Sequence, residues 1–293
     1  MAAISSATRH VPDTLKRTVR STWGVFGQAT RRTRVLPTFL IVGAQRCGTT
    51  SLFKALIQHP HVVGPVLRKG VHYFDTSYDR GEDWYRGHFP TRAATRARGD
   101  RPRVEVGESS PYYLFHPLAA ERIARDLPGV RVIVLLRDPV ERAYSAHSHE
   151  RARGFESEPF ERALELEEER LAGEEARLRA DPDAYSHSHS HQHHAYLGRG
   201  RYVEQLLRLE EHVGRDRMLV MDSESFFTTP EPLFTEVERF LGIPHADGIR
   251  FDRHNARPRA DMPDALRQRL VSYFTEPDAR LAAWWGRTPS WRA

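Results

Sequence analysis

Short apolar runs alternate with amphipathic segments along most of the 293-residue chain. The apolar runs are continuous, which is typical of strands that are buried on both faces of a parallel sheet. These predicted strands span residues 38–42, 104–106, 130–136 and 217–221. The amphipathic segments predict helices over residues 49–58, 119–126, 139–151, 232–241 and 265–274. The alternation predicts an α/β fold with three layers, in which helices flank a central, mainly parallel sheet.

Two polar segments interrupt this alternation. Residues 155–180 are rich in Glu, Ala, Leu and Arg, with acid–base pairs four positions apart such as Glu158 and Arg162, which is typical of a solvated helical face. Residues 186–194 alternate serine and histidine and then continue with glutamine and two more histidines. Histidine-rich tracts can bind Zn²⁺ or Ni²⁺, but no cysteine or carboxylate completes a site at fixed spacing. We therefore expect a polar, flexible loop at the mouth of the substrate site.

The net charge of +5 is concentrated at the N-terminus. Residues 1–36 hold seven Lys or Arg against one acidic residue, Asp13, which gives this segment +6 and leaves −1 for residues 37–293. We therefore expect a basic, flexible leader over residues 1–36, followed by a single domain over residues 37–293. A nearly neutral domain argues against nucleic-acid binding.

The chain shows no sign of membrane insertion or secretion. No apolar run approaches the roughly 20 residues that cross a bilayer, and the N-terminus lacks the apolar core of a signal peptide. The single cysteine, Cys47, excludes intrachain disulfides and is typical of a reducing compartment. These features predict no membrane span and a cytoplasmic location.

A glycine-rich loop separates the first predicted strand from the first predicted helix. Gly43 and Gly48 have the spacing of a P-loop, in which backbone N–H groups and a helix N-terminus surround an anion. A nucleotide triphosphatase needs lysine directly after the second glycine, and here Thr49 stands there. The loop's own cation is Arg46, so the sequence favours an anionic ligand held by Arg46, backbone donors and the hydroxyls of Thr49 and Thr50. The alternative is a glycine-rich turn without a ligand.

A second polar segment follows the strongest predicted strand. Arg137 comes directly after that strand, and the carboxyl ends of parallel strands face the ligand crevice. Ser145 lies on the following helix, where its hydroxyl can share the same anion. The alternatives are a salt bridge for Arg137 and a helix cap for Asp138. Pro139 is placed to begin the helix.

Together these segments resemble the two signature motifs of the sulfotransferases that use 3′-phosphoadenosine 5′-phosphosulfate (PAPS), especially bacterial members related to the heparan sulfate O- and N-sulfotransferases. The likeness extends over most of residues 38–293 and includes landmarks at residues 71–75, 107–112, 240–242 and 278–281. It implies an enzyme that moves a sulfuryl group to a hydroxyl or amine and releases 3′-phosphoadenosine 5′-phosphate (PAP). The acceptor is expected to be a carbohydrate or a glycosylated metabolite, and its identity and the oligomeric state stay open.

The resemblance also implies binding residues. In that family the first motif binds the 5′-phosphosulfate and the second binds the 3′-phosphate. The implied 5′ site consists of Arg46, Cys47, Gly48, Thr49, Thr50 and Ser51. The implied 3′ site consists of Arg137 and Ser145. Residues 199–202 resemble a segment that closes over the nucleotide, which adds Arg201.

The mechanism implied is an in-line displacement at sulfur. A sulfuryl group carries less charge than a phosphoryl group, so we expect no metal, but a cation near the bridging oxygen, for which Arg46 is the candidate, and a base. The family usually has Glu where this chain has Gly70. His72 is our first candidate for the base, or else a buried structural histidine, and Glu108 and Asp75 are alternatives. Two other hypotheses stay open: a P-loop kinase or NTPase, and a PAPS-binding protein with little activity.

Overall fold

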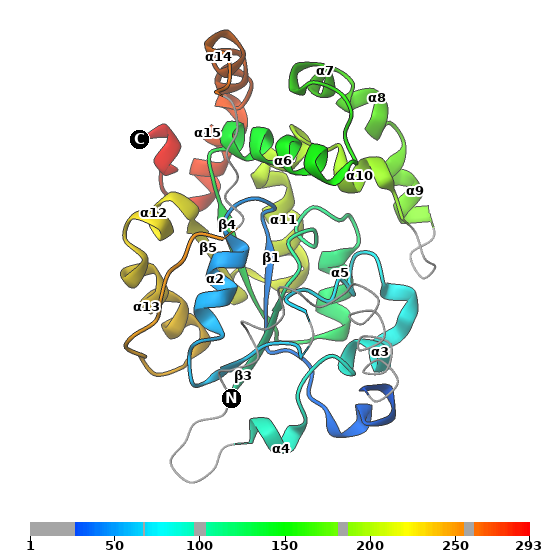
Figure 1. The fold of residues 1–293 in the computed structure, drawn as a ribbon, viewed down its shortest axis with the longest axis vertical. Helices are drawn as coiled ribbons and strands as arrows, with labels where there is room; N and C mark the ends of the chain where they lie inside the picture. The colour runs from blue at the N-terminus through cyan, green and yellow to red at the C-terminus, as the bar shows by residue number, and fades with distance from the viewer. Residues whose placement is uncertain (1–26, 67, 97–103, 181–186, 255–260) are drawn as a thin grey trace.

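The computed structural model describes residues 27–66, 68–96, 104–180, 187–254 and 261–293. It contains a five-stranded sheet in the order β2-β3-β1-β4-β5, in which all neighbouring strands are parallel (Figure 1). The strands are β1 Phe39–Gly43, β2 Val62–Val63, β3 Glu105–Ser109, β4 Arg131–Leu136 and β5 Met218–Asp222. The predicted α/β fold with its parallel sheet is confirmed.

The sheet positions a ligand crevice next to its central strand. β1 and β5 are buried at every position, and β4 at every position but the first, which explains why their sequences are continuously apolar. β1 lies between β3 and β4, so the chain passes to one side of β1 for β3 and then crosses to the other side for β4. Ligands of such sheets bind at the carboxyl ends of the strands where this direction reverses.

Helices cover both faces of the sheet (Figure 1). α2 Thr49–Leu56 lies on one face, while α5 Ala119–Asp126, α11 Tyr202–Val213 and α15 Thr275–Trp285 pack together on the other. The other helices are α3 Gly81–Arg86, α4 Arg92–Thr95, α6 Pro139–Arg153, α7 Phe160–Glu165, α8 Glu167–Leu171, α9 Glu174–Ala180, α10 His189–His193, α12 Ser223–Thr228, α13 Pro230–Leu241 and α14 Asp264–Tyr273. In the described part of the chain, no helix has both the length and the apolar character to cross a membrane.

The predicted helices are confirmed with ends that differ by at most two residues. Residues 155–180, predicted to be helical, contain the three short helices α7, α8 and α9. The sequence analysis did not predict α11 or α15, although both contribute buried apolar residues to the hydrophobic core.

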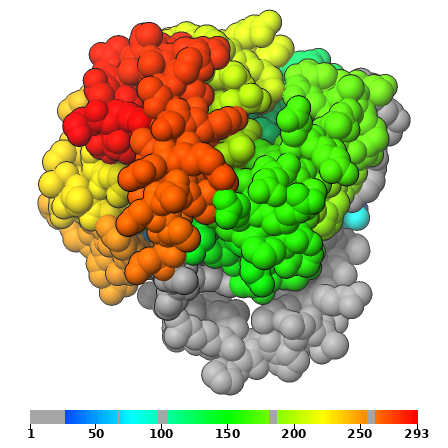
Figure 2. All heavy atoms as spheres, turned by 90° about the horizontal axis from the view of Figure 1, so that it is seen from above, coloured from blue at the N-terminus to red at the C-terminus, as the bar shows by residue number. Residues whose placement is uncertain are grey.

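Helices also cover the carboxyl ends of the strands. α6 crosses this end of the sheet (Figure 1), and Asp138 caps it by accepting a hydrogen bond from the Val140 N–H at 2.9 Å, which confirms the capping alternative for this residue. Seen from above, α14 in orange lies beside α6 and α7 in green (Figure 2), and the Arg267 guanidinium of α14 contacts the Glu141 carboxylate of α6 at 2.6 Å.

The predicted flexible loop in the histidine-rich segment is wrong for the part that the structure describes. Residues 189–193 form α10, in which His191 and His193 are buried. The Nδ1 atom of His191 lies 2.7 Å from the Tyr112 hydroxyl, and the Nδ1 atom of His193 lies 3.0 Å from the Glu150 carboxylate. These partners are distant in sequence, so local composition could not reveal that the imidazoles would be buried.

The N-terminal segment is described only in part. Residues 1–26 of the predicted leader lie outside the described residues. Residues 27–36 contact the domain: Arg34 is buried and donates a hydrogen bond to the Phe89 carbonyl, and Val35 belongs to the hydrophobic core. The domain boundary at residue 36 stays a prediction.

Candidate active site

The loop between β1 and α2 forms part of the wall of a pocket at the carboxyl end of the sheet. Gly48 precedes α2 with a φ angle of 85°, in the left-handed region that glycine adopts most easily. A Cβ atom at Gly48 would lie 2.9 Å from the Phe227 ring, so a larger residue would displace that ring. The first N–H groups of α2 have no acceptor within the helix, and Thr49 and Thr50 line the pocket. This end of α2 is therefore suited to bind an anion.

Arg46 joins the two sequence motifs. Its φ angle is 71°, an uncommon conformation for a residue other than glycine. Its Nε atom donates a hydrogen bond to the Ser145 hydroxyl of α6 at 3.0 Å. Both residues line the same pocket, which has a volume of about 420 Å³. The structure therefore brings residues of the two motifs together in one cavity.

The pocket is strongly basic. Its cationic side chains are those of Arg46, Lys69, Arg137, Arg153, Arg199 and Arg253. Among the described residues that line it, Glu224 is the only acidic one. Arg137, directly after β4, lies 3.4 Å from Glu224 and 3.7 Å from Glu141. Because such partly exposed ion pairs are weak, a phosphate group can replace these carboxylates around Arg137.

His72 faces the same pocket from a turn after Gly70. Its side chain is 40% exposed, and its Nδ1 atom lies 2.8 Å from the buried Asp75 carboxylate. The Asp75 charge raises the pKa of His72 above its ordinary value. The residue adopts a φ angle of 58°, so neighbouring groups must hold this strained backbone in place. With Nδ1 occupied by Asp75, Nε2 is the atom that can exchange a proton with a ligand.

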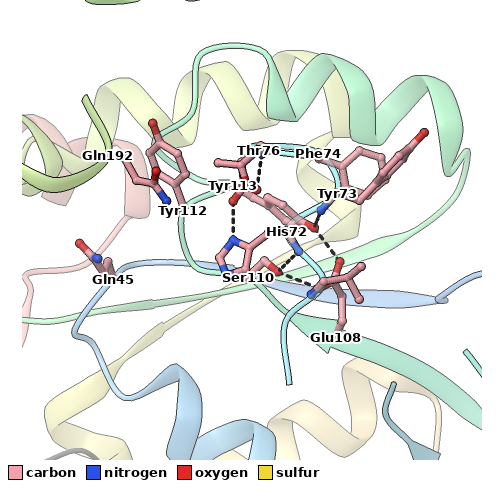
Figure 3. A network of polar contacts seen from close by, with 12 residues as sticks. Gln45, His72, Tyr73, Phe74, Thr76, Glu108, Ser110, Tyr112, Tyr113 and Gln192 are labelled. Carbon is pink, nitrogen blue, oxygen red and sulfur yellow. Dashed lines mark hydrogen bonds and ion pairs between the residues drawn. The ribbon is translucent and has the colours of Figure 1, made fainter. Parts of the chain in front are cut away.

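Glu108 and its neighbours hold the turn that carries His72 (Figure 3). The Glu108 carboxylate accepts a hydrogen bond from the Val71 N–H at 2.6 Å. The His72 N–H donates to the Ser110 hydroxyl at 3.1 Å, and the Tyr73 N–H donates to the Tyr113 hydroxyl at 2.8 Å. Three adjacent backbone donors of the turn are thus fixed by side chains at the end of β3 and just beyond it.

Glu108 itself is fully buried and does not line the pocket. Besides Val71, it accepts hydrogen bonds from the hydroxyls of Ser110, Tyr85 and Tyr113 at 2.8–2.9 Å. Burial raises the pKa of Glu108, while these donors favour its ionised form. The structure therefore places this candidate base behind the turn, as the acceptor that organises it.

Gly70 lies against the end of β3. The Lys69 carbonyl accepts a hydrogen bond from the Ser109 N–H at 3.1 Å. A Cβ atom at Gly70 would lie 2.5 Å from the Ser109 carbonyl oxygen. This backbone path has no room for the side chain that the family usually carries at this position.

Lys69 is a pocket residue that the sequence analysis did not assign to the site. Its ammonium donates to the Thr50 hydroxyl at 2.9 Å and lies 3.3 Å from the Thr49 hydroxyl. Burial lowers its pKa to about 7. The available signals were its rarity, since lysine occurs only at positions 16, 54 and 69, and its place two residues before a family landmark.

Two residues of the implied 5′ site lie beside the pocket. Cys47 is buried, with its Sγ atom 3.8 Å from the Tyr202 hydroxyl, and burial raises the pKa of this thiol to about 11. The Ser51 hydroxyl accepts a hydrogen bond from the His254 N–H at 3.0 Å. The pocket lining in the described chain includes neither side chain.

Arg199, two residues before the implied Arg201, is the arginine of that segment that lines the pocket. Its guanidinium donates to the Gln45 side chain at 2.6 Å and lies 4.8 Å from the centre of the Tyr112 ring. The Nε atom of Arg201 instead lies 3.4 Å from Glu204 on the surface. Arg199 thus connects the phosphate loop with the wall formed by α10.

Three further facts bear on the expected ligands. Among the described residues, no group of three or more His, Cys, Asp or Glu side chains is placed to hold a metal ion. Of the aromatic residues between positions 73 and 113, Tyr112 lines the pocket. Tyr73, Phe74 and Tyr85 pack on one another in the core.

Comparisons with known proteins identify the family. The sulfotransferase domain family matches residues 36–257. The chain is 29% identical over 230 residues to the bifunctional heparan sulfate N-deacetylase/N-sulfotransferase 3 of Homo sapiens, which covers 75% of this chain and 24% of that protein. It is 25% identical over 322 aligned positions to the membrane-associated sulfotransferase kil1 of Dictyostelium discoideum, an alignment that covers 88% of this chain and 67% of that protein. The chain thus spans about a quarter of its human relative.

A solved structure agrees with these matches. A sulfotransferase from Alicyclobacillus acidocaldarius superposes with a TM-score of 0.66 at 31% identity, covering 88% of this chain and 100% of that one. The domain match extends over most of the chain, and the two predicted motifs meet in one basic pocket. The chain belongs to the sulfotransferase family.

Proposed function

We propose that this protein transfers a sulfuryl group from PAPS to a hydroxyl or amine of an acceptor and releases PAP. The observation that carries the proposal is the 3.0 Å contact between Arg46 and Ser145, which unites the two motifs in one basic pocket. PAPS, when bound, supplies the activated sulfuryl group. The two motifs bind its two anionic ends.

The phosphate loop binds the 5′ end of PAPS. The first turn of α2 offers backbone donors and the positive end of a helix dipole, and Thr49 and Thr50 add hydroxyls. Arg46 supplies charge within the loop. Arg137 and Ser145 bind the 3′-phosphate, which replaces Glu141 and Glu224 around Arg137.

His72 acts as the general base. Asp75 holds its Nδ1–H, so Nε2 accepts the proton that the acceptor loses as its oxygen or nitrogen attacks sulfur. Glu108 positions His72 through the turn. This assignment follows from exposure, since His72 lines the pocket and Glu108 is fully buried.

The proposed acceptor is a carbohydrate or a glycosylated metabolite. The human relative is named for an N-sulfotransferase activity on heparan sulfate, a polysaccharide. The pocket continues past Ser145 along one face of α6, where Ser148, His149 and Arg153 offer polar groups to a hydroxyl-rich ligand. Tyr112 offers an aromatic wall.

A titration tests the donor, and a product assay tests the chemistry. The purified protein is titrated with PAP, and with ADP in the presence and absence of Mg²⁺. Tight PAP binding with weak ADP binding is expected, because only PAP carries a 3′-phosphate for Arg137. Binding of ADP that requires Mg²⁺, with no preference for PAP, would favour a P-loop kinase or NTPase. PAP binding without PAP formation from PAPS and a mixed acceptor pool would favour a binding protein with little activity.

A further inference from the structure

Lys69 supplies a second cation at the start of α2, where the phosphate loop has no lysine of its own. In a P-loop the residue after the second glycine is lysine, and here it is Thr49. The ammonium of Lys69 comes from another segment and contacts the hydroxyls of Thr49 and Thr50. A residue from outside the loop therefore places a positive charge at the start of α2.

The surroundings of Lys69 lack a neutralising partner in direct contact. Within the described chain, no carboxylate forms an ion pair with this ammonium, whose hydrogen-bond partners are the two neutral hydroxyls. The negative charge of the buried Glu108 raises the pKa of Lys69, while the positive charge of Lys54 in α2 lowers it. His72 lines the pocket from the neighbouring turn. A partly buried cation that lines the pocket in this way is suited to pair with an anion that binds there.

We propose that Lys69 is a catalytic residue that holds the sulfuryl-bearing end of PAPS and stabilises the charge on the leaving group. The inference rests on the proposed function. A bond forms between the acceptor atom and sulfur, and the bond between sulfur and the bridging oxygen of PAPS breaks. The electron pair leaves with that oxygen on PAP, and the acceptor proton passes to His72. Lys69 keeps its proton and pairs with the new charge, while Arg46 joins the loop to Ser145.

This role predicts a specific pH dependence. Lys69 must be charged, and its pKa in the free protein is about 7, so kcat/KM falls as the pH rises through that region. His72 must be neutral to accept a proton, so kcat/KM rises with pH through the pKa of His72, which Asp75 raises. The expected profile is a narrow bell whose alkaline limb belongs to Lys69.

Three variants test the assignment. Lys69→Gln removes the charge, and Lys69→Arg keeps a charge that does not titrate in this range. Lys54→Gln removes an exposed lysine of α2, the helix whose first turn Lys69 contacts, and serves as a matched control. We expect Lys69→Gln to lower kcat by about 10²–10³-fold, the effect of losing one donor to a developing charge. At pH 8, the kcat of Lys69→Arg should exceed that of Lys69→Gln. Both variants should lose the alkaline limb of the kcat/KM profile. At a pH below the pKa of Lys69, the kcat of Lys54→Gln should stay within about twofold of the parent protein.

Wild-type kcat in Lys69→Gln, or an alkaline limb that persists there, would overturn the inference. A second measurement uses the unmodified protein, so it depends neither on turnover nor on whether a variant folds. Calorimetry of PAP binding at pH 8, in two buffers that differ in ionisation enthalpy, should show that the unmodified protein takes up protons, because the bound anion recharges Lys69. Binding without proton uptake would also overturn the inference. Failure of the unmodified protein to bind PAP at all would instead refute the proposed function.

Discussion

Glu108→Gln is the substitution that best separates a positioning role from a catalytic one. The amide has the same shape as the carboxylate, but it carries no charge and offers one acceptor oxygen in place of two. Four donors now meet the carboxylate: the Val71 N–H and the hydroxyls of Ser110, Tyr85 and Tyr113. The hydroxyls can rotate to accept from the new amide, while the Val71 N–H keeps the remaining oxygen.

The magnitude follows from these four contacts. A hydrogen bond to a charged group contributes about 1.5–3 kcal/mol and a neutral one about 0.5–1.5, so each of the four loses about 1 kcal/mol. A neutral amide costs less to bury than a carboxylate, which offsets part of this loss; the same burial raises the pKa of Glu108. We therefore expect the free energy of unfolding to fall by about 2 kcal/mol.

Activity should fall as well, because the strained turn of His72 loses part of its support. We expect kcat to fall roughly ten- to hundredfold, while PAP affinity stays unchanged when it is measured at a pH where Lys69 remains charged. Urea unfolding, PAP formation and calorimetry measure the three quantities. Glu238→Gln is the matched control: Glu238 is also buried and accepts from the Ala246 N–H at 3.0 Å, but it contacts His245 and Ala246 rather than the turn that carries His72. Glu238→Gln should lower the free energy of unfolding and leave kcat unchanged.

Two outcomes would refute this reasoning. If Glu108→Gln loses turnover but keeps its free energy of unfolding, Glu108 is the base. If the variant loses stability but keeps its kcat, the turn does not depend on Glu108.

Three further predictions concern single side chains. Arg137→Ala should weaken PAP binding about ten- to hundredfold in calorimetry, since a charged hydrogen bond contributes roughly 1.5–3 kcal/mol, and unchanged affinity would remove Arg137 from the site. Asp75→Asn should lower the pKa of His72, so His72 stays neutral at lower pH and the acidic limb of kcat/KM should move to lower pH; an unmoved limb would show that His72 is not the titrating base. Gly70→Glu should lower the free energy of unfolding by about 1–3 kcal/mol through overpacking and should not raise turnover, whereas a gain in PAP formation would show that the base was simply missing.

The sequence predicted the parts of the site that depend on local spacing. The glycines of the phosphate loop, the apolar runs of β1 and β4 and the proline that begins α6 each follow rules that apply within a few residues. The resemblance then indicated that the two motifs serve one ligand. The contact between Arg46 and Ser145 joins them across 99 positions.

The residues that the sequence analysis missed depend on contacts between distant segments. Lys69 belongs to the site because its segment pairs with the end of β3 and passes the start of α2. Arg199 lines the pocket because residues 198–200 form a short 3₁₀ helix, in which Arg199 is buried. His191 and His193 of α10 are buried where they contact Tyr112 and Glu150, respectively. No periodicity within these segments encodes such partners.

The glycine at position 70 is part of the same arrangement that places Lys69 and His72. Without a Cβ atom, the chain passes close enough to β3 for Ser109 to bond the Lys69 carbonyl and for Glu108 to reach the Val71 N–H. The same path brings the Lys69 ammonium to Thr50 and holds His72 in the turn that faces the pocket. A glutamate at position 70 would force this path outward and would disturb the cation and the base together. Under the proposed function, a rebuilt active-site turn therefore explains why position 70 carries no carboxylate.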